Sequence, residues 1–228
     1  MKITRTKHGA RMSQGGAVLS EVLAKPGPTH SVFDLLAALV HVLAPGPRVG
    51  VLGFAGGGII APLRAMGGEH RIRAVDSDPR GGRLFFDICG DWAGEVQVDE
   101  DDAVDWLQRR RGRFDCILED LSELGVEGET KPVVSVVRLP ELVAQRLDPS
   151  GISIVNLLPV PAVAWRRLTP QVIAPFGKAL VVFLTEFENR IAIAGERLPR
   201  ADTLERRTKS ALATIGSRME RGFQIKKP

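Results

Sequence analysis

The stretch "VGVLGFAGGGII", residues 49–60, decides the fold, because a run of apolar residues turns there into a series of glycines. The first half is typical of a strand buried on both faces of a sheet, and a helix is expected to begin in the second half. Each of Gly56, Gly57 and Gly58 costs about 1 kcal/mol in a helix interior relative to alanine. We interpret these glycines either as a tight strand-to-helix turn or as a place where another group lies close to the backbone.

Similar apolar runs recur along the chain and alternate with segments of helical spacing. They predict strands at residues 48–54, 71–76, 95–99, 114–120, 151–158, 179–185 and 190–195. The expected helices include residues 31–43, with Ser31 as the N-cap, and residues 101–110 and 139–147. This alternation predicts an α/β fold with a doubly wound, mostly parallel sheet.

The last two predicted strands are joined only by "EFEN", residues 186–189. Because this connection is too short for a helical crossover, the two strands should pair antiparallel. The sequence therefore predicts a seven-stranded, Rossmann-like sheet of the class I methyltransferase type with an antiparallel last strand. Residues 1–30 are expected to form a short N-terminal β appendage, and residues 31–228 the α/β domain.

The composition is that of an ordinary globular protein. Of its 228 residues, 44% are hydrophobic and 25% are charged, and no apolar run approaches the length of about 20 residues that a membrane span needs. The first residues carry no apolar segment of the kind that marks a secretion signal. Cys89 and Cys116 stand apart in apolar surroundings and are interpreted as buried thiols. We therefore expect a cytoplasmic protein without a membrane partner.

The positive charge is concentrated at the two ends of the chain. The total is +4, whereas residues 1–11 carry a surplus of four positive charges and residues 196–228 a surplus of five, which leaves residues 12–195 at −5. A nucleic-acid partner would require a basic stripe over the working face, so none is expected. The basic C-terminal segment has apolar residues at helical spacing and is expected to cover either the sheet or a partner subunit, which leaves a homodimer open.

Acidic residues follow three neighbouring predicted strands. Asp76 ends "RIRAVD", Asp102 follows the next strand, and "EDLSE" places Asp120 and Glu123 after the fourth. Each has a structural explanation as a strand end, a helix cap or a turn residue. Ligands of open α/β sheets, however, bind beyond the carboxyl ends of the strands. Together with the glycine turn, these acids predict a pocket for a cationic ligand. Ala55 stands where a G-x-G-x-x-G fingerprint needs its middle glycine, which disfavours a nicotinamide dinucleotide.

With these motifs the sequence resembles the polyamine aminopropyltransferases, the spermidine synthase family. "VLGFAGGG" resembles the family's G-G-G-D-G-G loop, "VDSDP" its V-E-I-D-P, "DDAVDWL" its G-D-x-x-x-F-L and "FDCILEDLSE" its Y-D-V-I-x-x-D-S-T-D. The resemblance implies S-adenosylmethionine or its decarboxylated form as co-substrate, a small-molecule amine as acceptor and no metal. It also implies roles for individual residues: Asp120 as catalytic base, Glu123 as a second amine-binding acid, Asp76 at the ribose, Asp102 at the adenine, and Gly53, Gly56 and Gly57 in the donor-binding loop.

The sequence also departs from the family. Gly56 replaces the acid of the glycine loop, the motif after the fourth strand has no proline, and the chain contains no tyrosine. Three functions therefore stay open: an aminopropyltransferase-like enzyme, a small-molecule methyltransferase that uses the same pocket, and a non-catalytic relative. The four histidines are scattered and predict no metal site. "HGARMSQ", residues 8–14, matches the family's D-G-x-x-Q strand only loosely, so Gln14 is not assigned to the site.

Overall fold

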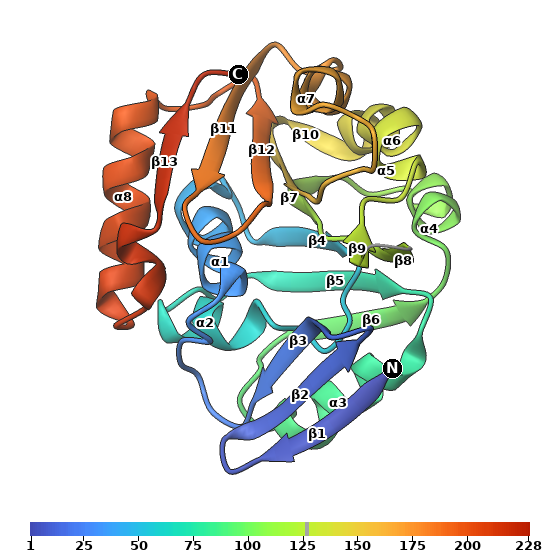
Figure 1. Ribbon diagram of the computed structural model, residues 1–228, viewed down its shortest axis with the longest axis vertical. Helices are drawn as coiled ribbons and strands as arrows, with labels where there is room; N and C mark the ends of the chain where they lie inside the picture. The colour runs from blue at the N-terminus through green and yellow to red at the C-terminus, as the bar shows by residue number, and fades with distance from the viewer. Residues whose placement is uncertain (126–127) are drawn as a thin grey trace.

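The predicted strands form a mixed sheet in the computed structural model, which describes residues 1–125 and 128–228 (Figure 1). The strand order is β13-β11-β12-β10-β7-β4-β5-β6. The strands are β4 (Arg48–Leu52), β5 (Arg71–Asp76), β6 (Val96–Glu100), β7 (Phe114–Glu119), β10 (Leu147–Leu157), β11 (Lys178–Leu184), β12 (Arg190–Gly195) and β13 (Phe223–Lys226). β6, β5, β4, β7 and β10 run parallel, and β12 pairs antiparallel with β10 and β11. The predicted fold class is confirmed.

Helices cover both faces of this sheet. Successive residues of β7 alternate between two apolar clusters, with Cys116 and Leu118 in one and Ile117 in the other. The first cluster includes residues of α1 (Val32–Leu43), α2 (Ile60–Ala65), α3 (Pro79–Cys89) and α8 (Ala201–Thr214). On the opposite face lie α4 (Ala103–Arg109) and α6 (Leu139–Arg146), with α7 (Trp165–Ile173) in a third cluster and α5 (Val134–Val137) beside it. Ser31 caps α1 as predicted, since its Oγ accepts a hydrogen bond from Phe33 N.

The sheet has one strand more than the sequence predicted. β13 pairs antiparallel with β11 at the edge, after α8 and the short 3-10 helix η1 (Arg218–Arg221). Phe223 and Ile225 point into the core, while Gln224 and Lys226 are exposed. A strand of four residues carries too little alternation to be recognised in the sequence. In the structure it is held by its pairing with β11 and by α8, where Glu205 Oε2 accepts a hydrogen bond from Ile225 N.

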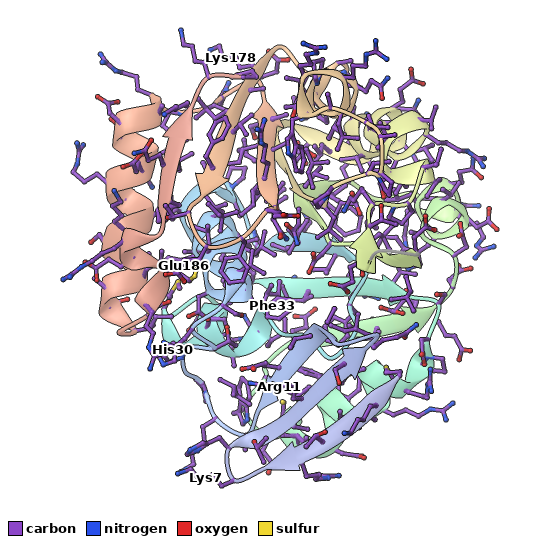
Figure 2. All side chains as sticks on the ribbon, in the orientation of Figure 1. Lys7, Arg11, His30, Phe33, Lys178 and Glu186 are labelled. Carbon is purple, nitrogen blue, oxygen red and sulfur yellow. The ribbon has the colours of Figure 1, made fainter. Side chains whose placement is uncertain are left out.

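The N-terminal residues form a separate antiparallel sheet of β1 (Lys2–Thr6), β2 (Gly9–Gln14) and β3 (Ala17–Leu23). This small sheet lies against α3 at the lower end of the molecule in Figure 1. Met12 and Val22 belong to the same apolar cluster as Phe33 of α1, which is labelled in Figure 2. The predicted β appendage therefore shares its core with the α/β domain, and a domain boundary at residue 30 stays a prediction.

A short hairpin follows β7 directly. It consists of β8 (Glu123–Gly125) and β9 (Gly128–Thr130), which pair antiparallel. The hairpin and the small sheet both reach the carboxyl ends of the central strands, where the candidate site lies. Within the described parts of the chain, every helix is too short or too polar to cross a membrane.

Candidate functional site

A hollow of about 250 Å³ lies at the carboxyl ends of β4, β5 and β7. Its floor is formed by residues that follow these strands, Gly53, Asp76 and Asp120. The small sheet contributes Met1, Met12, Gln14 and Leu19, and the β8–β9 hairpin contributes Glu123, Leu124 and Glu129. We call this space the acidic hollow.

Among the described residues, the side chains that line the acidic hollow include five carboxylates and neither a lysine nor an arginine. The carboxylates are Asp76, Asp78, Asp120, Glu123 and Glu129. Asp78 is paired with Arg80 at 2.5 Å, so its charge is largely compensated. The remaining acids give the hollow a negative potential, which attracts cations and disfavours anionic ligands.

Asp76 braces the glycine turn. Its Oδ2 accepts hydrogen bonds from Phe54 N at 2.9 Å and Ala55 N at 2.7 Å, and its Oδ1 accepts one from Asp78 N at 2.9 Å. Ala55 has a positive φ of 45°, a conformation that is strained for a residue with a side chain, and these hydrogen bonds hold it. A ribose diol would therefore have to share this carboxylate with the backbone, using its remaining lone pairs.

Asp120 is half-buried at the end of a row of amide side chains. Asn156 Nδ2 donates to Asp120 Oδ1 at 2.7 Å, and Asn189 Nδ2 donates to Asn156 Oδ1 at 3.0 Å. Burial raises the pKa of Asp120 to about 6, against the opposing effects of the Asn156 hydrogen bond and the charge of Lys131. A carboxylate with such a pKa is suited to accept a proton near neutral pH.

Behind Asp120 lies a buried ion pair between Lys131 and Glu119. Lys131 Nζ donates to Glu119 Oε1 at 2.9 Å, to the Leu121 carbonyl at 2.9 Å and to the Asn156 carbonyl at 2.6 Å. Its side chain is 0% exposed, and that of Glu119 is 2% exposed. All three ammonium protons are thus used to tie together the residues on both sides of Asp120 and the asparagine that contacts it. We call this arrangement the lysine clamp.

The glycine turn is packed mainly against the protein itself. A Cβ on Gly56 would lie 2.5 Å from Val22 Cγ2 and 2.8 Å from Met12 Sδ, both in the small sheet. Gly53 has a φ of +83°, and a Cβ there would lie 2.8 Å from the carbonyl oxygen of Asp120. The close approach expected from the sequence is therefore found, and the approaching groups at Gly56 are side chains of the chain's own N-terminal strands.

The predicted site residues are only partly brought together. Gly53, Asp76, Asp120 and Glu123 line the acidic hollow. Gly56 is buried beneath the small sheet, and Gly57 is buried against the rings of Phe54 and Phe85. Asp102 is exposed outside the hollow, and its Oδ1 caps α4 by accepting hydrogen bonds from Val104 N and Asp105 N.

Four residues with a part in this region were not predicted from the sequence: Gln14, Glu129, Lys131 and Asn156. Gln14 lines the hollow even though two extra residues separate it from Gly9, because it follows Ala10 and Met12 at two-residue spacing and so lies on the same face of β2 as these buried residues. The loose resemblance of "HGARMSQ" to D-G-x-x-Q was the available signal. For Lys131 no local pattern is available, whereas Asn156 is a polar residue inside the apolar run of residues 151–158, which is a signal for a buried polar side chain but not for its partner.

Comparison with known proteins supports the fold. No family model and no curated protein matches the sequence. Human methyltransferase-like protein 13 in complex with SAH is similar in structure, with a TM-score of 0.63 and 20% identity over 82% of this chain and 91% of that one. The spermidine synthase from Thermotoga maritima has a TM-score of 0.65 and 12% identity over 96% of this chain and 79% of that one. A spermidine synthase in complex with the transition state analogue AdoDATO has a TM-score of 0.64 and 11% identity over 96% of this chain and 79% of that one. At these identities the likeness shows a class I methyltransferase-like fold.

Proposed function

We propose that the protein is a transferase that binds an adenosine-bearing sulfonium, S-adenosylmethionine or its decarboxylated form, and moves a group from it to an amine. The single observation that carries this proposal is the position of Asp120. It is a carboxylate with a pKa of about 6, fixed by Asn156 and set in a hollow whose other charged side chains, among the described residues, are acidic. The fold is shared with solved methyltransferases and spermidine synthases, which supports the donor class.

The chemistry of the lining suits both reactants. A sulfonium and an ammonium are cations, and the carboxylates of Asp76, Asp120, Glu123 and Glu129, which form no ion pair within the described residues, can hold them at the carboxyl edge of the sheet. When bound, the donor supplies an electrophilic carbon beside a positively charged sulfur. Asp120 accepts a proton from the amine nitrogen, and Glu123 helps to orient the amine. The nitrogen lone pair then forms the new bond to that carbon while the carbon–sulfur bond breaks, and the sulfur leaves as a neutral thioether.

The size of the hollow sets a condition on binding. Its 250 Å³ is below the range of about 300–1,000 Å³ found for pockets of drug-sized ligands. The donor therefore has to extend past Asp76 toward the end of β6, where Asp102 lies, or displace Met12 and Leu19 of the small sheet. The first arrangement agrees with the adenine role that the resemblance gives to Asp102.

The packing of the glycine turn favours a second candidate. With Gly56 and Gly57 covered by the protein's own side chains, fewer backbone groups of this turn are open to a ligand. A non-catalytic relative that keeps the fold and has lost the donor would show this arrangement.

Isothermal titration calorimetry tests the proposal. The ligands are S-adenosylmethionine, its decarboxylated form and methylthioadenosine, titrated into the wild-type chain, Asp76→Ala and Asp120→Asn. Preference for the decarboxylated donor indicates aminopropyl transfer, and preference for the full donor indicates methyl transfer. We expect Asp76→Ala to lose binding and Asp120→Asn to retain it. If the wild-type chain gives no heat with any of the three, the transferase proposal is wrong and the non-catalytic candidate stands.

A further inference from the structure

A second hollow, of about 650 Å³, lies at the amino-terminal ends of the same strands that hold the acidic hollow. Seven arginines and three acids line it. Arg48 begins β4, Arg71 and Arg73 belong to β5, and the other four arginines fall within residues 109–113, between α4 and β7. We call this surface the arginine groove. The sequence "RRRGR" lies in the part of the chain whose net charge is negative, so only the fold reveals that these arginines meet Arg48, Arg71 and Arg73.

Several of these arginines form ion pairs that a ligand can replace. Arg71 pairs with Glu95 at 3.3 Å, and both side chains are more than half exposed. Arg109 pairs with Asp101, and Arg110 with Asp99. An exposed pair such as Arg71–Glu95 contributes about 0–1 kcal/mol, because water screens the charges and the side chains lose entropy. The other two pairs are partly exposed. A multivalent anion can therefore compete for the guanidinium groups.

Three other arginines of the groove have no acidic side chain, among the described residues, that neutralises their charge. In the described parts of the chain, Arg73 and Arg111 are exposed and have neither an ion pair nor a side-chain hydrogen bond. Arg113 donates only to the Leu147 carbonyl, at 2.5 Å. Arg48 is the exception, because it is held by Asp115 at 2.7 Å and Asp148 at 2.5 Å. Within residues 1–125 and 128–228, the guanidinium groups of Arg73, Arg111 and Arg113 thus have no carboxylate partner.

The aromatic residues of the groove are not available for stacking. Trp106 is 2% exposed and Phe114 is 6% exposed, and the guanidinium of Arg110 covers the Trp106 ring at 4.2 Å. Single-strand binders that hold bases do so on exposed aromatic faces. A ligand of this groove would be contacted through its charges and not through flat rings.

We propose that the arginine groove binds the phosphate backbone of a nucleic-acid strand without reading its bases. Guanidinium groups match phosphate oxygens with two parallel hydrogen bonds. Arg73, Arg111 and Arg113 come from two separate segments around an open hollow, an arrangement that suits consecutive phosphates of an extended chain. This inference goes beyond the transferase function and does not depend on it.

The test is the salt dependence of binding. Fluorescence anisotropy of a labelled single strand of about 20 nucleotides is measured between about 50 and about 200 mM salt, because each phosphate contact to a single strand contributes about 0.7 to the slope of log K against log salt. We expect Arg73→Ala/Arg111→Ala to lower that slope by about 1.4 and to weaken binding at low salt. The matched control is Arg166→Ala/Arg167→Ala on α7, which removes the same charge from two exposed arginines outside the groove. It should leave the slope unchanged.

Three results would overturn the proposal. The first is that the wild-type chain does not bind the strand at the lowest salt concentration. The second is that both double variants lose binding equally, which would show that binding depends on the net charge of the whole protein and not on the groove. The third is that ATP, at the same phosphate concentration, displaces the labelled strand as well as an unlabelled strand does. The groove would then be a site for a small phosphate compound. Circular dichroism confirms that both variants are folded before the comparison is made.

Discussion

The two ends of β4, β5 and β7 carry opposite charges and are built in opposite ways. At the carboxyl ends, Asp120 is held by Asn156, and the lysine clamp behind it is fully buried. At the amino ends, six of the seven arginines that line the groove are exposed, and their ion pairs are exposed or partly exposed. A buried polar network fixes one geometry, whereas exposed charges adapt to a ligand. The difference indicates a site of defined chemistry at one end and an electrostatic binding surface at the other.

The largest effect is expected when the carboxylate of the acidic hollow is removed. Asp120→Asn retains the hydrogen bond from Asn156 but cannot accept a proton, so amine transfer should fall by about 10²–10⁴-fold while donor binding is kept. The matched control is Asp78→Asn, which removes a carboxylate from the same hollow and retains an N-cap residue for α3. This variant should change the rate of amine transfer far less. Turnover is measured with the donor that calorimetry selects. Equal losses in the two variants would show that Asp120 has no special role.

The pH dependence of transfer sharpens the same point. Because burial raises the pKa of Asp120 to about 6, this group is largely protonated, and inactive as a base, at pH 5. The rate should therefore rise about tenfold per pH unit below 6 and level off above it. The rate constant is measured between pH 5 and 8 at saturating donor. A flat profile in the wild-type chain would exclude Asp120 as the group that limits the rate.

Breaking the lysine clamp should destabilise the protein strongly. Lys131→Met leaves the carboxylate of Glu119 buried without a partner, which costs about 3–5 kcal/mol in the free energy of unfolding. Glu119→Gln/Lys131→Met removes both charges and should recover part of that loss. Urea unfolding measures all variants, together with Arg73→Ala/Arg111→Ala, which should stay within about 0.5 kcal/mol of the wild-type chain. A small effect of Lys131→Met would contradict the contrast between a buried end and an exposed end.

The two ends also differ in what the sequence could show. The acids of the hollow were predictable because Asp76 and Asp120 each end a strand with a clear apolar pattern, and strand ends of a parallel sheet meet at one edge. Lys131, Asn156 and the arginine groove were not, because their contacts join segments far apart in the chain. Lys131 contacts Asn156 across 25 positions, for example. The glycines gave a correct expectation of close approach, but the sequence does not tell a ligand from the chain's own Met12 and Val22.

A smaller effect distinguishes these two explanations of the glycine turn. Gly56→Ala places a Cβ 2.5 Å from Val22 Cγ2, and such overpacking costs about 1–3 kcal/mol of stability. In Gly82→Ala the new Cβ lies 3.4 Å from Val98 Cγ1, an ordinary contact in α3, and the variant should be about 0.4–1 kcal/mol more stable. Urea unfolding of both variants is the measurement. If Gly56→Ala is as stable as the wild-type chain and binds donor less tightly, the turn serves the ligand more than the small sheet.

The smallest effect concerns Asp102, which lies outside the hollow, after β6, and caps α4. Asp102→Ala removes the acceptor for Val104 N and Asp105 N and should cost about 1 kcal/mol of stability. Asp102→Asn keeps the cap, because asparagine is an equally good N-cap residue, and it removes only the charge. If the donor extends from Asp76 toward the end of β6, Asp102→Asn should bind it about three- to tenfold less tightly at unchanged stability. Unchanged donor affinity in Asp102→Asn would limit the role of Asp102 to capping the helix. The donor would then have to displace Met12 and Leu19, and variants of those two residues would change its affinity.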